Sequence, residues 1–113
     1  MMFQSVFGRD YENIMEDLRR PYKGYIPLCV AITTNKLDAM ILLIEHGANV
    51  NKPIKCWSKY TPLHIAVMCN NEDAVRILMD HGANPRLTDR SFNDPIYIAG
   101  TRKYEHLIKL MTI

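Results

Sequence analysis

Hydrophobic side chains recur at the spacing of an α-helix in two stretches near the middle of the chain, which predicts amphipathic helices there. The two stripes consist of Leu37, Met40, Ile41 and Ile44, and of Ala74, Val75, Leu78 and Met79. Each stripe is followed by a glycine, Gly47 or Gly82, that can adopt the positive φ with which many helices end.

A shorter helix is predicted before each stripe, because proline is well suited to the first turn of a helix, where its missing N–H is not needed. These helices are expected to begin at Pro27, Pro62 and Pro95. Thr61 and Asp94 precede two of the prolines and are good N-cap residues.

Asn35 and Asn70 follow the first two prolines by eight residues and fit a tight turn, since asparagine tolerates left-handed φ. The predicted unit is therefore a helix, a turn, a second helix and a glycine stop.

This unit repeats along the chain. Residues 26–31 recur as residues 61–66 and again as residues 94–99, and their prolines lie 35 and then 33 residues apart. The tetrapeptide His-Gly-Ala-Asn occurs at residues 46–49 and at residues 81–84. Because one pair of short helices cannot bury its own apolar stripe, a repeat of this length predicts stacked units that share a continuous core.

The repeated segments resemble ankyrin repeats. Residues 61–84, with Thr-Pro-Leu-His at their start and Gly-Ala-Asn at their end, look like one full repeat. Residues 24–51 resemble a second, in which Ile26 and Cys29 replace the threonine and the histidine. Residues 94–113 resemble an incomplete third, with Tyr97 at the histidine position and Lys103 at the turn. The resemblance implies an all-α solenoid of helix-turn-helix units with protruding inter-repeat loops.

We expect one domain over residues 1–113, since the chain is short for more than one. Within it we predict a capping helix at 9–20, repeats at 22–56 and 57–89, and a partial repeat at 90–113. The capping helix would carry one further helical stripe, Tyr11, Ile14, Met15 and Leu18, with acidic residues on its outer side.

Composition narrows the function classes. Hydrophobic residues make up 48% of the chain and charged residues 23%, which is typical of a folded globular protein. The net charge of +2 is too even to favour nucleic acid or a membrane surface as partner. Three cysteines, no signal-like N-terminus and no long apolar run predict an intracellular protein, cytoplasmic or nuclear, without a membrane span.

The sequence offers no pattern that would support catalysis or metal binding. The four histidines, His46, His64, His81 and His106, form no zinc-type spacing with the cysteines. Phosphate-binding loops and hydrolase motifs are also missing from the sequence. We therefore expect no enzyme activity, no cofactor and no metal. Cys29 and Cys69 lie at helical positions that should face neighbouring units, so we expect both to be buried.

The loops between units are the best candidates for binding. Residues 51–60 contain three lysines, no acidic residue and the single tryptophan, and aromatic and basic side chains are common at binding hot spots. The predicted partner-binding residues are Lys52, Lys55, Trp57, Lys59 and Tyr60, with Arg86, Arg90 and Phe92 in the next loop. The alternative is that Trp57 shields the core and that the lysines are only solvated.

Taken with the resemblance, these loops predict a non-enzymatic protein-interaction module that presents a concave surface of loops and inner helices to a protein with an acidic surface. Two alternatives stay open. The chain could be a fragment or short member of a larger viral or host adaptor that recruits partners to a ubiquitin ligase, or the lysine loop could bind nucleic acid. For the C-terminal unit we expect either fraying or, as the weaker alternative, self-association through exposed Ile108 and Met111. By resemblance, Asn51 is a candidate for asparaginyl hydroxylation.

Overall fold

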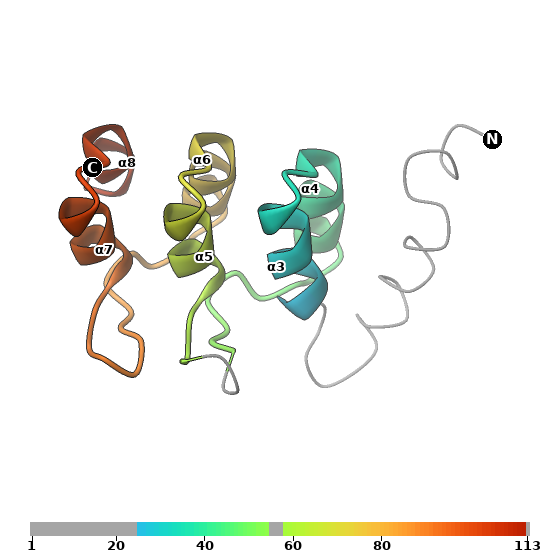
Figure 1. The fold of residues 1–113 in the computed structure, drawn as a ribbon. Helices are drawn as coiled ribbons and strands as arrows, with labels where there is room; N and C mark the ends of the chain where they lie inside the picture. The colour runs from blue at the N-terminus through green and yellow to red at the C-terminus, as the bar shows by residue number, and fades with distance from the viewer. Residues whose placement is uncertain (1–24, 55–57, 113) are drawn as a thin grey trace.

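The computed structural model describes residues 25–54 and 58–112, and these residues form three pairs of antiparallel helices stacked side by side (Figure 1). One helix of each pair lies in an inner layer and the other in an outer layer. The inner helices are α3 (Tyr25–Thr33), α5 (Pro62–Met68) and α7 (Pro95–Thr101), and the outer helices are α4 (Leu37–Glu45), α6 (Glu72–Asp80) and α8 (Glu105–Met111). The predicted capping helix at 9–20 lies outside the described residues.

The predicted helix starts are largely confirmed. Thr61 caps α5, because its Oγ1 accepts a hydrogen bond of 3.3 Å from the backbone N–H of His64. Asp94 caps α7 in the same way, with 2.7 Å between its Oδ1 and the backbone nitrogen of Tyr97. The exception is α3, which begins at Tyr25 and not at Pro27. Pro27 still lies in the first turn of α3, where a helix does not need its N–H.

The predicted turns and helix ends are also confirmed. Asn35 and Asn70 adopt left-handed φ values of 57° and 52° between the helices of their pairs, and Lys103 takes the same position in the third pair with φ 61°. Gly47 and Gly82 follow the outer helices with φ values of 100° and 89°. Glycine adopts such angles without steric cost, whereas at Lys103 the Cβ makes a positive φ less favourable.

One hydrophobic core runs through all three pairs. Each inner helix contacts the next inner helix, and each outer helix contacts the next outer helix. Leu63 and Leu78, which the sequence places between units, are 1% and 0% exposed. The stack therefore buries the apolar stripes that a single pair would leave in water.

Candidate interaction surface

The loops that join one pair to the next project from the same edge of the stack (Figure 1). Each described loop begins with an asparagine whose side chain folds onto its own backbone. Oδ1 of Asn49 accepts from the N–H of Asn51 at 2.9 Å, and Oδ1 of Asn84 accepts from the N–H of Arg86 at the same distance. These turns explain why asparagine ends the Gly-Ala-Asn motif, since its short side chain can hydrogen-bond the backbone two residues ahead.

Asn51 links the two loop bases. Its Nδ2 donates to the carbonyl of Gly82 at 3.1 Å, and its Oδ1 accepts from the backbone N–H of Asn84 at 2.7 Å. Both ends of this side-chain amide are therefore hydrogen-bonded to the start of the next loop. Asn51 holds neighbouring loops at a fixed distance, a role that sequence reasoning did not assign to it.

The first loop closes like a hairpin. Ile54 and Tyr60 form an antiparallel bridge, with 2.8 Å between the nitrogen of Ile54 and the carbonyl oxygen of Tyr60. Lys59 is exposed with φ 56°, and Lys52 is half-buried near the loop base. The predicted binding residues Lys55 and Trp57 lie outside the described residues.

The second loop is organised by Asp89, a residue that is not among the predicted binding residues. Asp89 is 7% exposed, and its Oδ1 accepts from the backbone N–H groups of Ser91 at 2.8 Å and of Asn93 at 3.1 Å. A hydrogen bond from the backbone N–H two residues ahead is typical of turns that begin with aspartate, so this turn could have been predicted from the sequence. The carboxylate thus fixes the loop backbone and does not lie on the surface beside Arg90.

Phe92 stands at the tip of the second loop. Its side chain is 86% exposed and its φ is 63°. A bulky residue with positive φ is uncommon and costs on the order of 1–3 kcal/mol, so the surrounding loop must hold it there. The N–H of Phe92 donates to the carbonyl of Asp89 at 3.0 Å, which supplies part of that restraint. The loop therefore presents an aromatic ring to solvent from a fixed backbone.

The two loops are joined to each other and to the helix layer. The backbone N–H of Arg90 donates to the carbonyl of Ser58 at 2.9 Å. His64, which is fully buried at the start of α5, approaches the carbonyl of Asn93 with its Nε2 at 2.9 Å. Because a carbonyl only accepts, Nε2 carries the proton and donates. The loop edge is thus one connected surface and not a set of independent loops.

The same hydrogen bonds define the protonation state of His64. Its Nδ1 accepts from the backbone N–H of Thr61 at 3.1 Å and lies 2.7 Å from the Thr61 hydroxyl. A ring that accepts at one nitrogen and donates at the other is neutral. Burial lowers the pKa of His64 from its usual 6.5, although the Asn93 carbonyl and the carboxylates of Asp89 and Asp94 oppose that shift.

The charge on this edge is basic. Lys59, Arg86 and Arg90 are exposed and Lys52 is half-buried, while Asp89 directs its carboxylate to backbone N–H groups. A run of cations on connected loops attracts an acidic surface and raises the rate of association.

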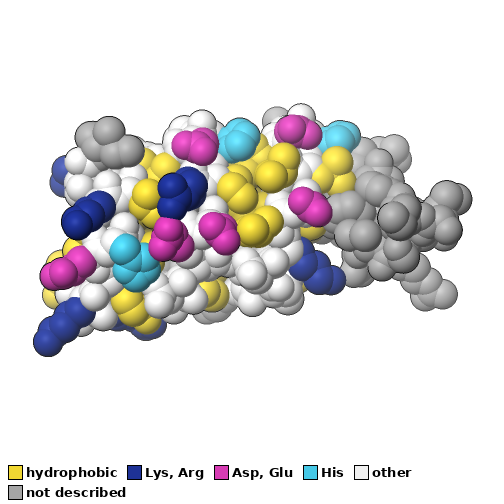
Figure 2. All heavy atoms as spheres, turned by 90° about the horizontal axis from the view of Figure 1, so that it is seen from above, with side chains coloured by type: hydrophobic (Ala, Val, Ile, Leu, Met, Phe, Trp, Pro, Cys, Tyr) yellow, Lys and Arg dark blue, Asp and Glu magenta, His cyan; other side chains and the backbone are white. Residues whose placement is uncertain are grey.

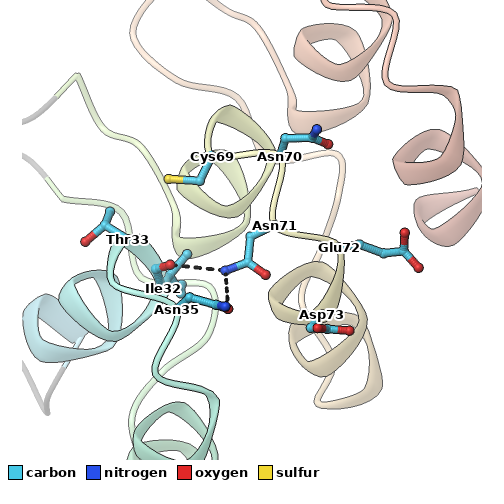
Figure 3. A pocket seen from close by; sticks show the side chains of 8 residues that line it. All are labelled: Ile32, Thr33, Asn35, Cys69, Asn70, Asn71, Glu72 and Asp73. Atoms are coloured by element: carbon cyan, nitrogen blue, oxygen red, sulfur yellow. Dashed lines mark hydrogen bonds between the residues drawn. The ribbon is translucent and has the colours of Figure 1, made fainter.

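At the opposite end of the inner helices, a polar hollow of about 360 Å³ lies between the first two pairs (Figure 3). Asn71 crosses it, donating from Nδ2 to the carbonyl of Ile32 at 3.2 Å and to Oδ1 of Asn35 at 3.1 Å.

Cys69 lines the hollow and is exposed, so the expectation that it is buried was wrong. Since α5 ends at Met68, Cys69 is the residue after the helix and not part of its packed face. Cys29 is buried as expected, and burial raises the pKa of its thiol to about 12.

The expected exposed apolar pair at the C-terminal end is also only partly present. Met111 is 3% exposed and Ile108 is half-buried. Met111 stands 33 residues after Leu78 and takes the equivalent core position, which removes it from any self-association surface.

Within residues 25–54 and 58–112, no helix is long and apolar enough to cross a membrane. The same residues contain no group of three or more His, Cys, Asp or Glu side chains that could hold a metal ion.

Comparison with curated proteins found no match. Residues 3–89 match the family model for ankyrin repeats, in three copies. The helix pair of α7 and α8 lies beyond the matched residues, yet it packs on the second pair as the second packs on the first. Ankyrin repeats generally serve as protein–protein interaction modules, and with most of its length matched and its helices stacked in this way, the chain belongs to the ankyrin-repeat family.

Proposed function

We propose that this protein binds a partner protein through the loop edge, with aromatic side chains inserting into the partner and basic side chains orienting it. The contact residues would be Lys52, Lys55, Trp57, Lys59, Tyr60, Arg86, Arg90 and Phe92. Function of this kind needs no cofactor and no turnover. An intracellular compartment suits it, because the exposed thiol of Cys69 would be kept reduced there.

The observation that carries the proposal is Phe92. A ring that is 86% exposed forgoes the favourable free energy of burying its apolar surface in the unbound protein, and its positive φ adds backbone strain. Neither feature contributes to the fold, because Phe92 belongs to no part of the buried core. Burial of this ring in a partner's pocket would recover the apolar contribution, and the preformed loop would lose little entropy on binding.

The basic residues favour an acidic partner surface. Exposed cations beside an aromatic anchor contribute mainly to the rate and orientation of association, and salt screens that contribution. The salt dependence of affinity distinguishes a protein partner from nucleic acid, because a partner with several phosphates would show a steep loss of affinity as salt is added.

The test is to isolate the partner from the native cell with the wild-type chain and to measure the dissociation constant with purified components. Phe92→Ala and Trp57→Ala should each weaken binding about thirtyfold, which corresponds to about 2 kcal/mol. Lys109→Ala is the control, since Lys109 is exposed on the outer helix α8, away from both the loops and the inner helices. Helical circular dichroism should be unchanged in all three variants.

Unchanged affinity in both folded loop variants would refute the proposal. Unfolding of Trp57→Ala alone would leave Phe92→Ala as the deciding variant. A slope of affinity against salt that reflects several phosphate contacts would assign the loop edge to nucleic acid instead.

A further inference from the structure

The outer helices carry a second surface whose chemistry is opposite to that of the loop edge. On α6, Glu72 and Arg76 form an ion pair of 2.6 Å one helical turn apart. On α8 the equivalent positions, 33 residues later, are Glu105 and Lys109. A charged pair at this spacing is a common solution for a solvated helix face.

Helix α4 departs from this pattern. The positions equivalent to Glu72 and Arg76 are Leu37 and Ile41, and both are partly exposed. Leu42 on α4 and Ile77 on α6 are also partly exposed and extend the apolar surface from one outer helix to the next. We call these four residues, Leu37, Ile41, Leu42 and Ile77, the outer patch. Leu37 and Ile77 also pack partly against the core. Since the equivalent units fold with charged side chains at the positions of Leu37 and Ile41, stacking does not require these two residues to be apolar.

Acidic side chains border the outer patch. On α4, Asp38 and Glu45 lie one turn before and one turn after the pair formed by Ile41 and Leu42, and all four share one face of the helix. Asp73 and Asp80 stand at the same places on α6. All four carboxylates are exposed, and none forms an ion pair within the described part of the chain. Figure 2, which looks down on the outer layer, shows hydrophobic side chains gathered on this face, with acidic side chains and also a basic one beside them.

We propose that the outer patch is a second docking surface, which binds an amphipathic segment of another protein that carries Lys or Arg beside apolar side chains. The apolar side chains would cover Leu37 and Ile41, and the basic ones would meet the carboxylates of α4 and α6. Charge complementarity selects this occupant, because an acidic or neutral apolar segment would leave four bordering carboxylates without a counter-charge.

This surface is independent of the proposed function. It lies on the outer layer, whereas the loop edge continues from the inner helices, and the two have opposite charge. Two partners of opposite charge could therefore occupy the protein at once.

The test uses a synthetic 18-residue helical peptide of leucine and lysine, with a peptide of leucine and glutamate as its matched control. The variant Leu37→Glu/Ile41→Arg installs on α4 the pair that α6 already carries, and it leaves the net charge unchanged. We expect it to weaken binding of the leucine–lysine peptide at least tenfold, as measured by titration calorimetry on the full chain. The swapped pair Glu105→Lys/Lys109→Glu on α8, also neutral in net charge, should bind as the wild type does.

Charge is tested separately with Asp38→Asn/Asp73→Asn, which should lower affinity more at low salt than at high salt. If the double variant on α4 fails to fold, Ile41→Gln serves in its place, since it removes the apolar side chain without adding a charge. Equal binding of both peptides, or equal binding by wild type and a folded α4 variant, would overturn the proposal. It would also be overturned if sedimentation showed that the wild type self-associates without peptide and that the α4 variant does not, because the occupant would then be a second copy of the chain.

Discussion

Replacement of Leu78 by alanine should be among the most damaging single changes in the core. Leu78 lies on α6, the middle outer helix, and is 0% exposed. Helix α6 is packed on one side by α4 and on the other by α8, with α5 beneath it. Truncation to alanine removes buried carbon atoms worth about 2 kcal/mol of transfer free energy.

The cavity left by the change adds to that loss. Reported costs of Leu→Ala in cores span about 2–5 kcal/mol, and the upper values belong to sites that cannot collapse. Because three helices hold the walls around Leu78, we expect a loss of about 3–4 kcal/mol. Total stabilities of single domains are about 5–15 kcal/mol, so the variant should remain folded in buffer but unfold at clearly lower urea.

The measurement is equilibrium unfolding in urea followed by circular dichroism, with the slope m held common to both proteins. Met79→Ala is the matched control, because Met79 is the next residue on the same helix and is only partly buried. We expect the control to cost about 1 kcal/mol or less. The reasoning is refuted if Leu78→Ala costs less than 1 kcal/mol, or no more than Met79→Ala.

Three further changes test other parts of the structure. Gly100→Ala should stabilise the protein by about 0.5–1 kcal/mol in the same urea assay, because Gly100 lies within α7 and an added Cβ would meet no atom within 4 Å; a loss of stability would contradict that geometry. His64 has a folded-state pKa below its usual 6.5, so the unfolded state takes up the proton first as the pH falls. The free energy of unfolding should therefore decline below about pH 6.5, and it should decline less in a His64→Asn variant. An equal decline in His64→Asn would show that another group is responsible. In a Cys56→Ser background, a thiol reagent should label Cys69 in the native protein and Cys29 only after unfolding; rapid labelling of both would show that Cys29 is not buried.

Most of the helical architecture follows from local signals in the sequence. Proline, glycine and capping residues determine where helices begin and end through backbone geometry alone, and the period of 33 to 35 residues determines which faces meet. The errors arise where a residue lies just outside an element. Cys69 belongs to the helical pattern by its position in sequence, but α5 ends one residue before it.

The candidate site was less predictable, because loop structure depends on contacts between residues far apart in sequence. The composition of the loops indicated a basic, aromatic surface, but it could not show that Asn51 binds the next loop base or that Arg90 bonds to Ser58. Nor could composition show the local hydrogen bonds of Asp89, whose carboxylate supports the backbone that displays Phe92.

A nearly balanced net charge conceals a separation of charge between two faces. The described loops concentrate exposed Lys and Arg, whereas the exposed side chains of α4 and α6 are mostly acidic. In a repeat protein each loop and each outer helix recurs at the same place in successive units, so substitutions at equivalent positions accumulate on one face. The pair Leu37 and Ile41 marks the unit at which the outer face changes from charged to apolar. Two surfaces of different chemistry on one rigid stack imply that losing one should leave the other intact. Phe92→Ala should accordingly leave binding of the leucine–lysine peptide unchanged, and the α4 double variant should leave binding at the loop edge unchanged.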